Sequence, residues 1–136
     1  MHLSLFTDGG ARGNPGPAAS GVVVKNDQNK ILFAGGTHLG HQTNNFAEYT
    51  AAIEAFTKAK ELGATEVSLY ADSKLVIEQL KRNWKVKEPT LQKLFMVAWN
   101  LMSNFKKVTL THIPRAKNVE ADAEVNRILD SVSLEK

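Results

Sequence analysis

Four acidic residues stand where a predicted strand ends or a predicted helix begins. Asp8 follows the alternating apolar residues of segment 2–7, and Asp72 ends another alternating segment directly before a helix. Glu48 falls in the first turn of a predicted helix, and Asp122 lies near the start of the last one. Converging carboxylates repel one another unless cations are present. Because the sequence has no cysteine, oxygen ligands for a hard cation such as Mg²⁺ or Mn²⁺ are the metal chemistry it predicts.

Each acid taken alone also has a structural explanation. Asp8 precedes two glycines, which is typical of a turn, and Asp72, directly before Ser73, suits a helix cap. Glu48 lies three residues after Asn45, the spacing of a capping box, and Asp122 suits a solvated helix face. The functional interpretation therefore depends on all four acids meeting at one place.

The elements that must position these acids follow from hydrophobic periodicity. Strands are predicted over residues 2–7, 19–25, 30–37, 66–72 and 107–113, and helices beginning near Asn45, Ser73, Pro89 and Asn118. Short connections join the first three strands, which predicts antiparallel pairing, whereas the later strand–helix order predicts parallel pairing. The expected fold class is α/β, with a mixed five-stranded sheet flanked by helices.

Glycine, proline and asparagine mark the expected loops and helix ends. Residues 9–17 predict a long loop, and residues 26–29 predict a hairpin turn. Asn44 or Asn45 is expected to cap the first long helix, whose apolar stripe ends at Leu62. The loop 9–17 lacks the residues of a phosphate-binding P-loop or a dinucleotide fingerprint, so neither a nucleoside triphosphatase nor a Rossmann dehydrogenase is supported.

Length and composition limit the remaining classes. A chain of 136 residues with 43% hydrophobic and 23% charged residues predicts a single globular domain over 1–136. The lack of cysteine excludes cysteine hydrolases and zinc ribbons. No apolar run approaches the roughly 20 residues of a membrane span, so a cytoplasmic location is expected. The net charge is +3, and residues 74–93 are its most basic segment, which suits either a polyanionic partner or a solvated helix face.

Four segments resemble the sequence blocks of the type 1 ribonuclease H family, in the same order and at the same distances. They are FTDGGARGNPGPAASGVVV, TNNFAEYTAAIEA, LYADSKLVIEQL and HIPRAKNVEADAEVN, and together they extend over nearly the whole chain. The ribonuclease H-like fold that this resemblance implies agrees with the predicted order of elements. The implied function is a metal-dependent endoribonuclease that hydrolyses the RNA strand of RNA/DNA hybrids and leaves 5′-phosphate and 3′-hydroxyl ends.

The same resemblance assigns the four acids as catalytic and metal-binding residues. Asp8 would bridge two Mg²⁺ ions, with Glu48 and Asp72 on one ion and Asp122 on the other, and Mn²⁺ is a possible substitute. Two divalent ions can neutralise the phosphate, generate a nucleophile from water and stabilise the leaving alkoxide.

The resemblance also implies contacts with the hybrid from residues around the acids. Asn14, Asn44 and Asn45 are expected at the minor groove and Thr43 at a DNA phosphate. Glu48 and the main chain near Gly10 and Ser73 are expected at ribose hydroxyls, which distinguish RNA from DNA. The other predicted substrate-binding residues are Lys74, Trp84, Lys85, Arg115 and Asn118. Lys74, where relatives often have Gln, equally suits an exposed helix lysine.

Two departures from the family pattern affect substrate grip and catalysis. The connection 83–89 is too short for the extra basic helix and loop that several relatives carry. Trp84 and Lys85 are predicted to act as a reduced version of that element, and the alternative is that Trp84 packs on the edge of the core.

The second departure is the missing histidine of a longer, glycine-rich loop that many relatives have before the last acid. Segment 114–118 has no histidine, and His112 lies on the last predicted strand, too early for that role. His112 is therefore interpreted as a packed or solvated side chain. Arg115 or Lys117 is expected either to assist electrostatically or to be a solvated loop cation.

These departures leave two alternatives to hybrid cleavage. One is a catalytically weak or inactive module that binds hybrids or double-stranded RNA on the same fold, and the other is cleavage of double-stranded RNA. The sequence indicates no protein partner, so a monomer is expected.

Overall fold

The computed structural model describes residues 1–134. Its elements are β1 (His2–Ala11), β2 (Gly16–Lys25), β3 (Ile31–Gln42), α1 (Asn44–Glu61), β4 (Glu66–Ala71), α2 (Lys74–Leu80), α3 (Pro89–Met102), β5 (Lys107–His112), the short 3₁₀ helix η1 (Arg115–Lys117) and α4 (Val119–Leu134). The predicted order of strands and helices is confirmed.

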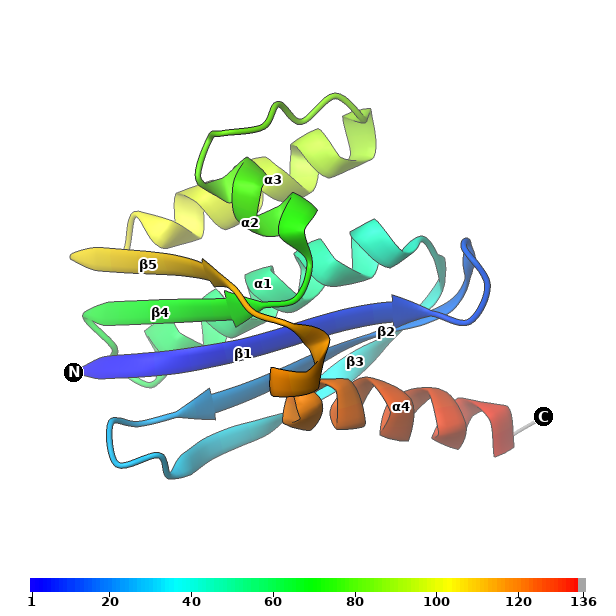
Figure 1. Ribbon diagram of the computed structural model, residues 1–136, viewed down its shortest axis with the longest axis horizontal. Coiled ribbons are helices and arrows are strands. Elements are labelled where there is room, and N and C mark those ends of the chain that lie inside the picture. The colour runs from blue at the N-terminus through cyan, green and yellow to red at the C-terminus, as the bar shows by residue number, and fades with distance from the viewer. Residues whose placement is uncertain (135–136) are drawn as a thin grey trace.

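The five strands form one mixed sheet in the order β3-β2-β1-β4-β5 (Figure 1). β1 pairs antiparallel with β2, and β2 with β3, because short turns connect them. β4 pairs parallel with β1 and with β5, because a helical crossover separates each pair in the sequence. The predicted fold class is confirmed, and the parallel part brings the carboxyl ends of β1, β4 and β5 to one edge.

The helices lie on both faces of the sheet (Figure 1). α1, α2 and α3 cover one face, where Leu5, Val22 and Phe56 belong to a single buried cluster. α4 covers part of the opposite face, where Val125 and Leu129 pack on Ala19 of β2. Each large apolar side chain buried in this way contributes about 2 kcal/mol, so burial stabilises the packing of helices on both faces of the sheet.

The loop predicted over residues 9–17 is largely strand. The ladder between β1 and β2 continues through Gly9, Gly10 and Ala11, and only residues 12–15 form the turn. Glycine is a weak strand former, but the antiparallel pairing with β2 supplies the hydrogen bonds that keep these residues extended. β3 likewise runs beyond the predicted end at residue 37, to Gln42.

The start of α1 also differs from the prediction. Thr43 is the N-cap, and its Oγ1 accepts a hydrogen bond of 3.1 Å from the amide of Phe46. Asn44 and Asn45 are helical residues, so their predicted capping role is wrong, and Glu48 lies beyond capping-box range. Leu62 follows the helix and is 37% exposed, so it does not extend the buried stripe.

α2 begins after Asp72, not at it. Ser73 is the N-cap, and its Oγ accepts a hydrogen bond of 3.3 Å from the amide of Val76. The carboxylate of Asp72 is therefore not used to cap the helix.

No helix within residues 1–134 is long and apolar enough to cross a membrane.

Candidate active site

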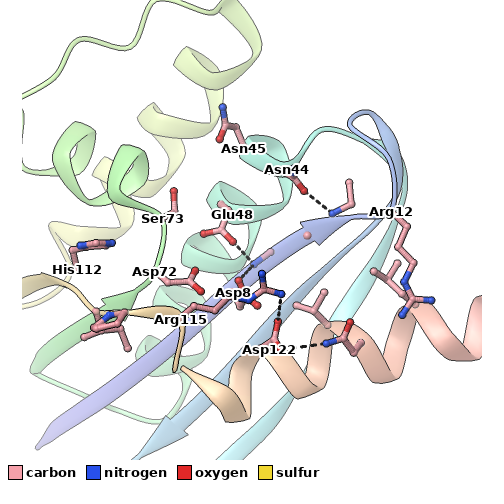
Figure 2. A pocket seen from close by; sticks show the side chains of 18 residues that line it. Asp8, Arg12, Asn44, Asn45, Glu48, Asp72, Ser73, His112, Arg115 and Asp122 are labelled. Carbon is pink, nitrogen blue, oxygen red and sulfur yellow. Dashed lines mark hydrogen bonds and ion pairs between the residues drawn. The ribbon is translucent and has the colours of Figure 1, made fainter. Parts of the chain in front are cut away.

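Asp8 and Asp72 lie side by side because their strands are parallel neighbours. The register pairs Thr7 with Ala71, so the following residue on each strand is an acid at the same edge of the sheet. Asp8 is only 7% exposed, and Asp72 is half-buried. Figure 2 shows both carboxylates facing the same cavity.

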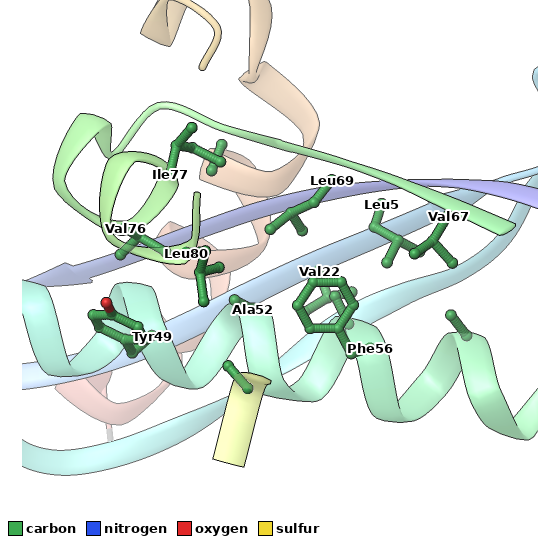
Figure 3. Packing of buried hydrophobic residues seen from close by; sticks show 14 of the residues in the cluster. Leu5, Val22, Tyr49, Ala52, Phe56, Val67, Leu69, Val76, Ile77 and Leu80 are labelled. Carbon is green, nitrogen blue, oxygen red and sulfur yellow. The ribbon is translucent and has the colours of Figure 1, made fainter. Parts of the chain in front are cut away.

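Glu48 reaches this edge from α1 because strand and helix backbones nearly touch. A Cβ on Gly9 would lie 2.3 Å from the carbonyl carbon of Ala47, so only glycine permits this approach. The amide of Gly9 donates a hydrogen bond of 2.5 Å to Oε1 of Glu48 (Figure 2). Tyr49 and Phe56 anchor the same helix in the core (Figure 3). Packing thus holds the Glu48 carboxylate in place.

The three carboxylates converge closely enough to hold a cation. Asp8, Glu48 and Asp72 each offer one oxygen, and these atoms lie within 4.8 Å of one another. Burial, with the charges of Asp72 and Asp122, raises the pKa of Asp8 to about 7, although its hydrogen bond with Glu48 acts the other way. Burial and the Asp8 charge raise the pKa of Glu48 well above its usual range.

Burial is the first cause of both raised pKa values and the neighbouring acids add to it, so a positive charge would stabilise the ionised cluster. A divalent cation would supply it, and the donor set of carboxylate oxygens without sulfur or imidazole suits a hard ion. The residues present therefore fit the metal that the sequence predicts.

The fourth acid comes from α4, which two contacts hold beside β1. Gly21, paired with Asp8, faces the helix so closely that a Cβ there would lie 2.3 Å from the carbonyl oxygen of Ala121. The side-chain amide of Asn118 donates a hydrogen bond of 2.7 Å to the carbonyl of Thr7. Both contacts position the first turn of α4 next to the edge of the sheet where Asp8 and Asp72 lie.

Asp122 itself remains outside the tight triad. One of its carboxylate oxygens lies 3.5 Å from the guanidinium of Arg115, and the other accepts a hydrogen bond of 3.2 Å from the side-chain amide of Asn126. The four acids nevertheless line a single cavity of about 800 Å³ (Figure 2). The convergence on which the sequence interpretation depended is present.

Comparison with known proteins agrees with this geometry. Residues 6–128 match a family described as reverse transcriptase-like. The ribonuclease HI of Halobacterium salinarum is 42% identical over 128 residues, which are 94% of this chain and 64% of that protein. The solved ribonuclease H1 structure from the same organism superposes with a TM-score of 0.93 at 40% identity, covering 96% of this chain and 99% of that one.

The chain belongs to the ribonuclease H family. A structure of LC11-RNase H1 in complex with an RNA/DNA hybrid also superposes, with a TM-score of 0.91 at 38% identity over 96% of this chain and 98% of that one. The bifunctional protein Rv2228c of Mycobacterium tuberculosis is 42% identical over 98% of this chain. The chain spans only 37% of that relative's length and 64% of the halobacterial protein.

Within this member of the ribonuclease H family, the predicted minor-groove asparagines meet between the β1–β2 turn and α1. Oδ1 of Asn44 accepts a hydrogen bond of 2.8 Å from the amide of Ala11, and Oδ1 of Asn14 accepts one of 3.0 Å from the amide of Asn44. Both oxygens therefore tie the end of β1 and the following turn to the helix, and within residues 1–134 neither side-chain NH₂ group forms a hydrogen bond. Asn45 is exposed at the rim of the cavity (Figure 2).

Other predicted contacts divide between the rim and the interior. Gly10 and Ser73 line the cavity of the acids, and Thr43 is exposed at the start of α1. Asn118 is 1% exposed, with its amide donated to Thr7, so it lies inside the protein and holds α4 in position.

Lys74, Trp84 and Lys85 lie away from the acids, around the connection between α2 and α3. Trp84 is 44% exposed, and the Nζ of Lys74 lies 5.9 Å from its ring centroid. Trp84 and Lys85 line a separate cavity of about 680 Å³. Trp84 is thus not packed into the core, and residues 81–88 contain no additional helix between α2 and α3.

Arg115 and His112 lie on the wall of the cavity that follows β5. Arg115 is highly exposed on η1, lines the cavity and pairs with Asp122. His112 also lines the cavity, which the sequence interpretation did not anticipate. The signal for it was available, because a last strand parallel to β4 must end beside Asp72.

Two further groups escaped sequence reasoning. Gly9 and Gly21 place the acids through backbone approaches that no sequence pattern encodes. Arg12 lines the cavity at the far side from His112 and pairs with Asp130 at 2.5 Å.

Proposed function

We propose that this chain is a divalent-metal-dependent endoribonuclease that hydrolyses the RNA strand of RNA/DNA hybrids, leaving 5′-phosphate and 3′-hydroxyl ends. The observation that carries the proposal is the convergence of Asp8, Glu48 and Asp72 within 4.8 Å in a cavity that Asp122 completes. Membership of the ribonuclease H family supports this activity over that of an inactive binding module, because such a module does not need a buried, mutually repelling acid cluster.

Asp8, Glu48 and Asp72 would hold the metal, with Asp122 as a fourth ligand, and the preferred ion would be Mg²⁺, in two copies. When bound, such ions neutralise the phosphate and activate water for attack. The protein supplies the fixed geometry. The strand ends and the hydrogen bond from Gly9 hold the carboxylate oxygens before any ion or substrate arrives.

Arg115 is the cation placed to stabilise charge on the phosphate. It is exposed, and its contact of 3.5 Å with Asp122 is too long for a tight ion pair. A phosphate entering the cavity would compete for this guanidinium and gain bidentate hydrogen bonds. Arg115 thereby takes over part of the electrostatic role of the missing loop histidine.

Recognition of the hybrid would use groups on both sides of the acids. The NH₂ groups of Asn14, Asn44 and Asn45 suit minor-groove acceptors, and Thr43 suits a DNA phosphate. The main chain at Gly10 and Ser73, with Glu48, suits ribose hydroxyls. Trp84 with Lys74 and Lys85 would contact the second strand by stacking and charge.

The deciding experiment incubates the protein with an end-labelled RNA/DNA hybrid, the matching double-stranded RNA and double-stranded DNA. Each is tested with Mg²⁺, Mn²⁺ or EDTA, and the products are tested for ligatable 5′-phosphates and extendable 3′-hydroxyls. We expect cleavage of the RNA strand of the hybrid alone, abolished by EDTA and by Asp8→Asn. Asp27→Asn is the matched control, because Asp27 lies in the β2–β3 turn, outside the cavity of the acids, and pairs with His2.

Three other outcomes would redirect the assignment. Hybrid binding without cleavage under either metal would make the chain a binding module. Cleavage of double-stranded RNA at a similar rate would widen the substrate class. Cleavage by Asp8→Asn at the wild-type rate would remove the acid cluster from the mechanism. We further propose that the chain works as a monomer in the cytoplasm.

A further inference from the structure

We propose that His112 is a substrate-positioning residue that hydrogen-bonds the backbone phosphate next to the scissile one, on the Ser73 side of the acid cluster. The inference rests on the proposed function, since it concerns the strand that the acids would cleave.

The position of His112 follows from the parallel pairing of β4 and β5. His112 pairs with Ala71, the residue before Asp72, and the amide of Ile113 donates a hydrogen bond of 2.9 Å to the carbonyl of Ala71. Strand side chains alternate, and Leu110, two residues earlier, packs against the core under α2 and α3. His112 therefore projects on the side of the sheet where α2 begins.

The imidazole is at the rim of the catalytic cavity and is not engaged elsewhere. His112 is exposed and lines the same cavity as Asp72 and Ser73. Figure 2 shows it beyond Asp72, on the opposite side from Arg12. Within residues 1–134, the side chain of His112 forms no hydrogen bond or ion pair, whereas Arg12 and Arg115 both pair with acids.

This position of His112 suits contact with a polyanionic strand that crosses the acid cluster. A strand whose scissile phosphate lies over the acids places its adjacent phosphates toward the two sides of the cavity, where repulsion by the carboxylates must be offset. An imidazole keeps at least one N–H donor whether it is neutral or protonated. His112 can thus donate to a phosphate oxygen without first giving up an internal partner.

A contact of this kind is made before and during the reaction, so its loss should appear in KM and not in kcat. We expect His112→Ala to raise KM for the hybrid about tenfold, the equivalent of one charge-assisted hydrogen bond, with kcat nearly unchanged. His112→Arg, which restores a donor at the same place, should recover most of the loss. His38→Ala is the matched control, because His38 is exposed on β3 outside the cavity.

A phosphate scan identifies the contact directly. Hybrids carrying a single neutral methylphosphonate at successive RNA positions are titrated against Asp8→Asn and against Asp8→Asn combined with His112→Ala. We expect one position next to the scissile bond to weaken binding about tenfold in the first protein and to have no effect in the second. The same scan on the DNA strand should show no such dependence on His112.

The results separate failure of this inference from failure of the proposed function. If wild-type protein cleaves no hybrid, the proposed function fails, and the binding scan still decides the contact. If wild-type protein cleaves but His112→Ala keeps its KM, or if kcat falls with KM unchanged, the positioning role is overturned. Should His112→Ala unfold, His112→Phe, which keeps a planar ring but has no N–H donor, is subjected to the same measurements.

Discussion

The inner and outer halves of the acid cluster are built in different ways. Asp8 and Glu48 are 7% and 9% exposed and are placed by paired strands and by a helix that is anchored in the core. The side chains of Asp122 and Arg115 are 28% and 79% exposed and are held by a 3.5 Å contact and one side-chain hydrogen bond. Burial prevents the inner half from rearranging, whereas the outer half can move without loss of packing.

This difference assigns different tasks to the two halves. Keeping the inner carboxylates ionised costs free energy, because burial and mutual repulsion raise their pKa values. A bound cation would offset that cost. The outer pair can exchange partners when a phosphate arrives, since Arg115 is solvated. Substitutions in the two halves should therefore differ in size and in kind.

After Asp8→Asn, the largest effect is expected from Glu48→Gln. Glutamine keeps the shape and the acceptor for the Gly9 amide but removes the charge that a cation needs, so kcat/KM on the hybrid should fall at least about a thousandfold. Single-turnover kinetics with Mg²⁺ measure the loss, and thermal unfolding in EDTA should show no decrease in stability. Glu61→Gln, exposed at the end of the same helix, is the control, and a loss of less than tenfold for Glu48→Gln would contradict the inner assignment.

Gly9→Ala should disturb the inner half of the acid cluster by steric overlap between β1 and α1. The added Cβ would overlap the α1 backbone at Ala47, so β1 and α1 must separate, and we expect a loss of about 3 kcal/mol in the free energy of unfolding. Urea denaturation measures it. Gly10→Ala is the matched control, since its Cβ would meet only the Val125 side chain at 3.4 Å. Equal stabilities for the two variants would show that the close approach is not required.

Asp122→Asn should cost less than Glu48→Gln. Asparagine keeps one oxygen ligand, and the neighbouring helix and Arg115 are free to adjust, so a loss of roughly tenfold to a hundredfold in kcat/KM is expected. The two variants are compared in the same single-turnover assay. A loss as large as that of Glu48→Gln would mean that the outer acid is as indispensable as the inner ones.

The pH dependence of stability tests the raised pKa values. In EDTA, the Asp8 carboxyl binds its proton more tightly in the folded state, with a pKa of about 7 against an ordinary value of 3.8, so its stabilising contribution is complete below pH 4 and is lost as the pH rises through 7. The stability of Asp8→Asn relative to wild type should therefore increase between pH 4 and pH 8. Thermal unfolding across this range measures it, and Mg²⁺ should stabilise wild type more at pH 8 than at pH 5. A stability difference between Asp8→Asn and wild type that does not change with pH would refute the raised pKa of Asp8.

The smallest effect is expected from Trp84→Ala, at the outer limit of the proposed interface. Trp84 is exposed and contacts Lys74, so removing its ring should raise KM for the hybrid about threefold and leave kcat unchanged. The control is Trp99→Ala. Trp99 is an exposed tryptophan of α3, and its ring centroid lies 5.3 Å from the Cζ of Arg82. Equal KM values for the two variants would remove Trp84 from the interface.

Much of this protein was predictable from its sequence, because periodicity and motif order are local properties. The alternation in segments 2–7 and 66–72 predicted strands ending at Asp8 and Asp72, and the later helical stripes predicted the crossovers that make their pairing parallel. The family resemblance then indicated which acids belong together. Errors were confined to places where competing local signals exist, such as the glycines of β1 that pair as strand residues and the asparagines displaced by Thr43 as helix cap.

Only the tertiary structure decided how the acids are held and what surrounds them. The backbone approaches at Gly9 and Gly21, the separation of Asp122 from the tight triad and the place of His112 at the cavity rim depend on which elements meet. Distances between residues far apart in the chain are set by packing and register, and a local pattern contains neither. The sequence thus determined which side chains can do the chemistry, and the fold determined which of them are held rigidly and which can exchange partners with a substrate.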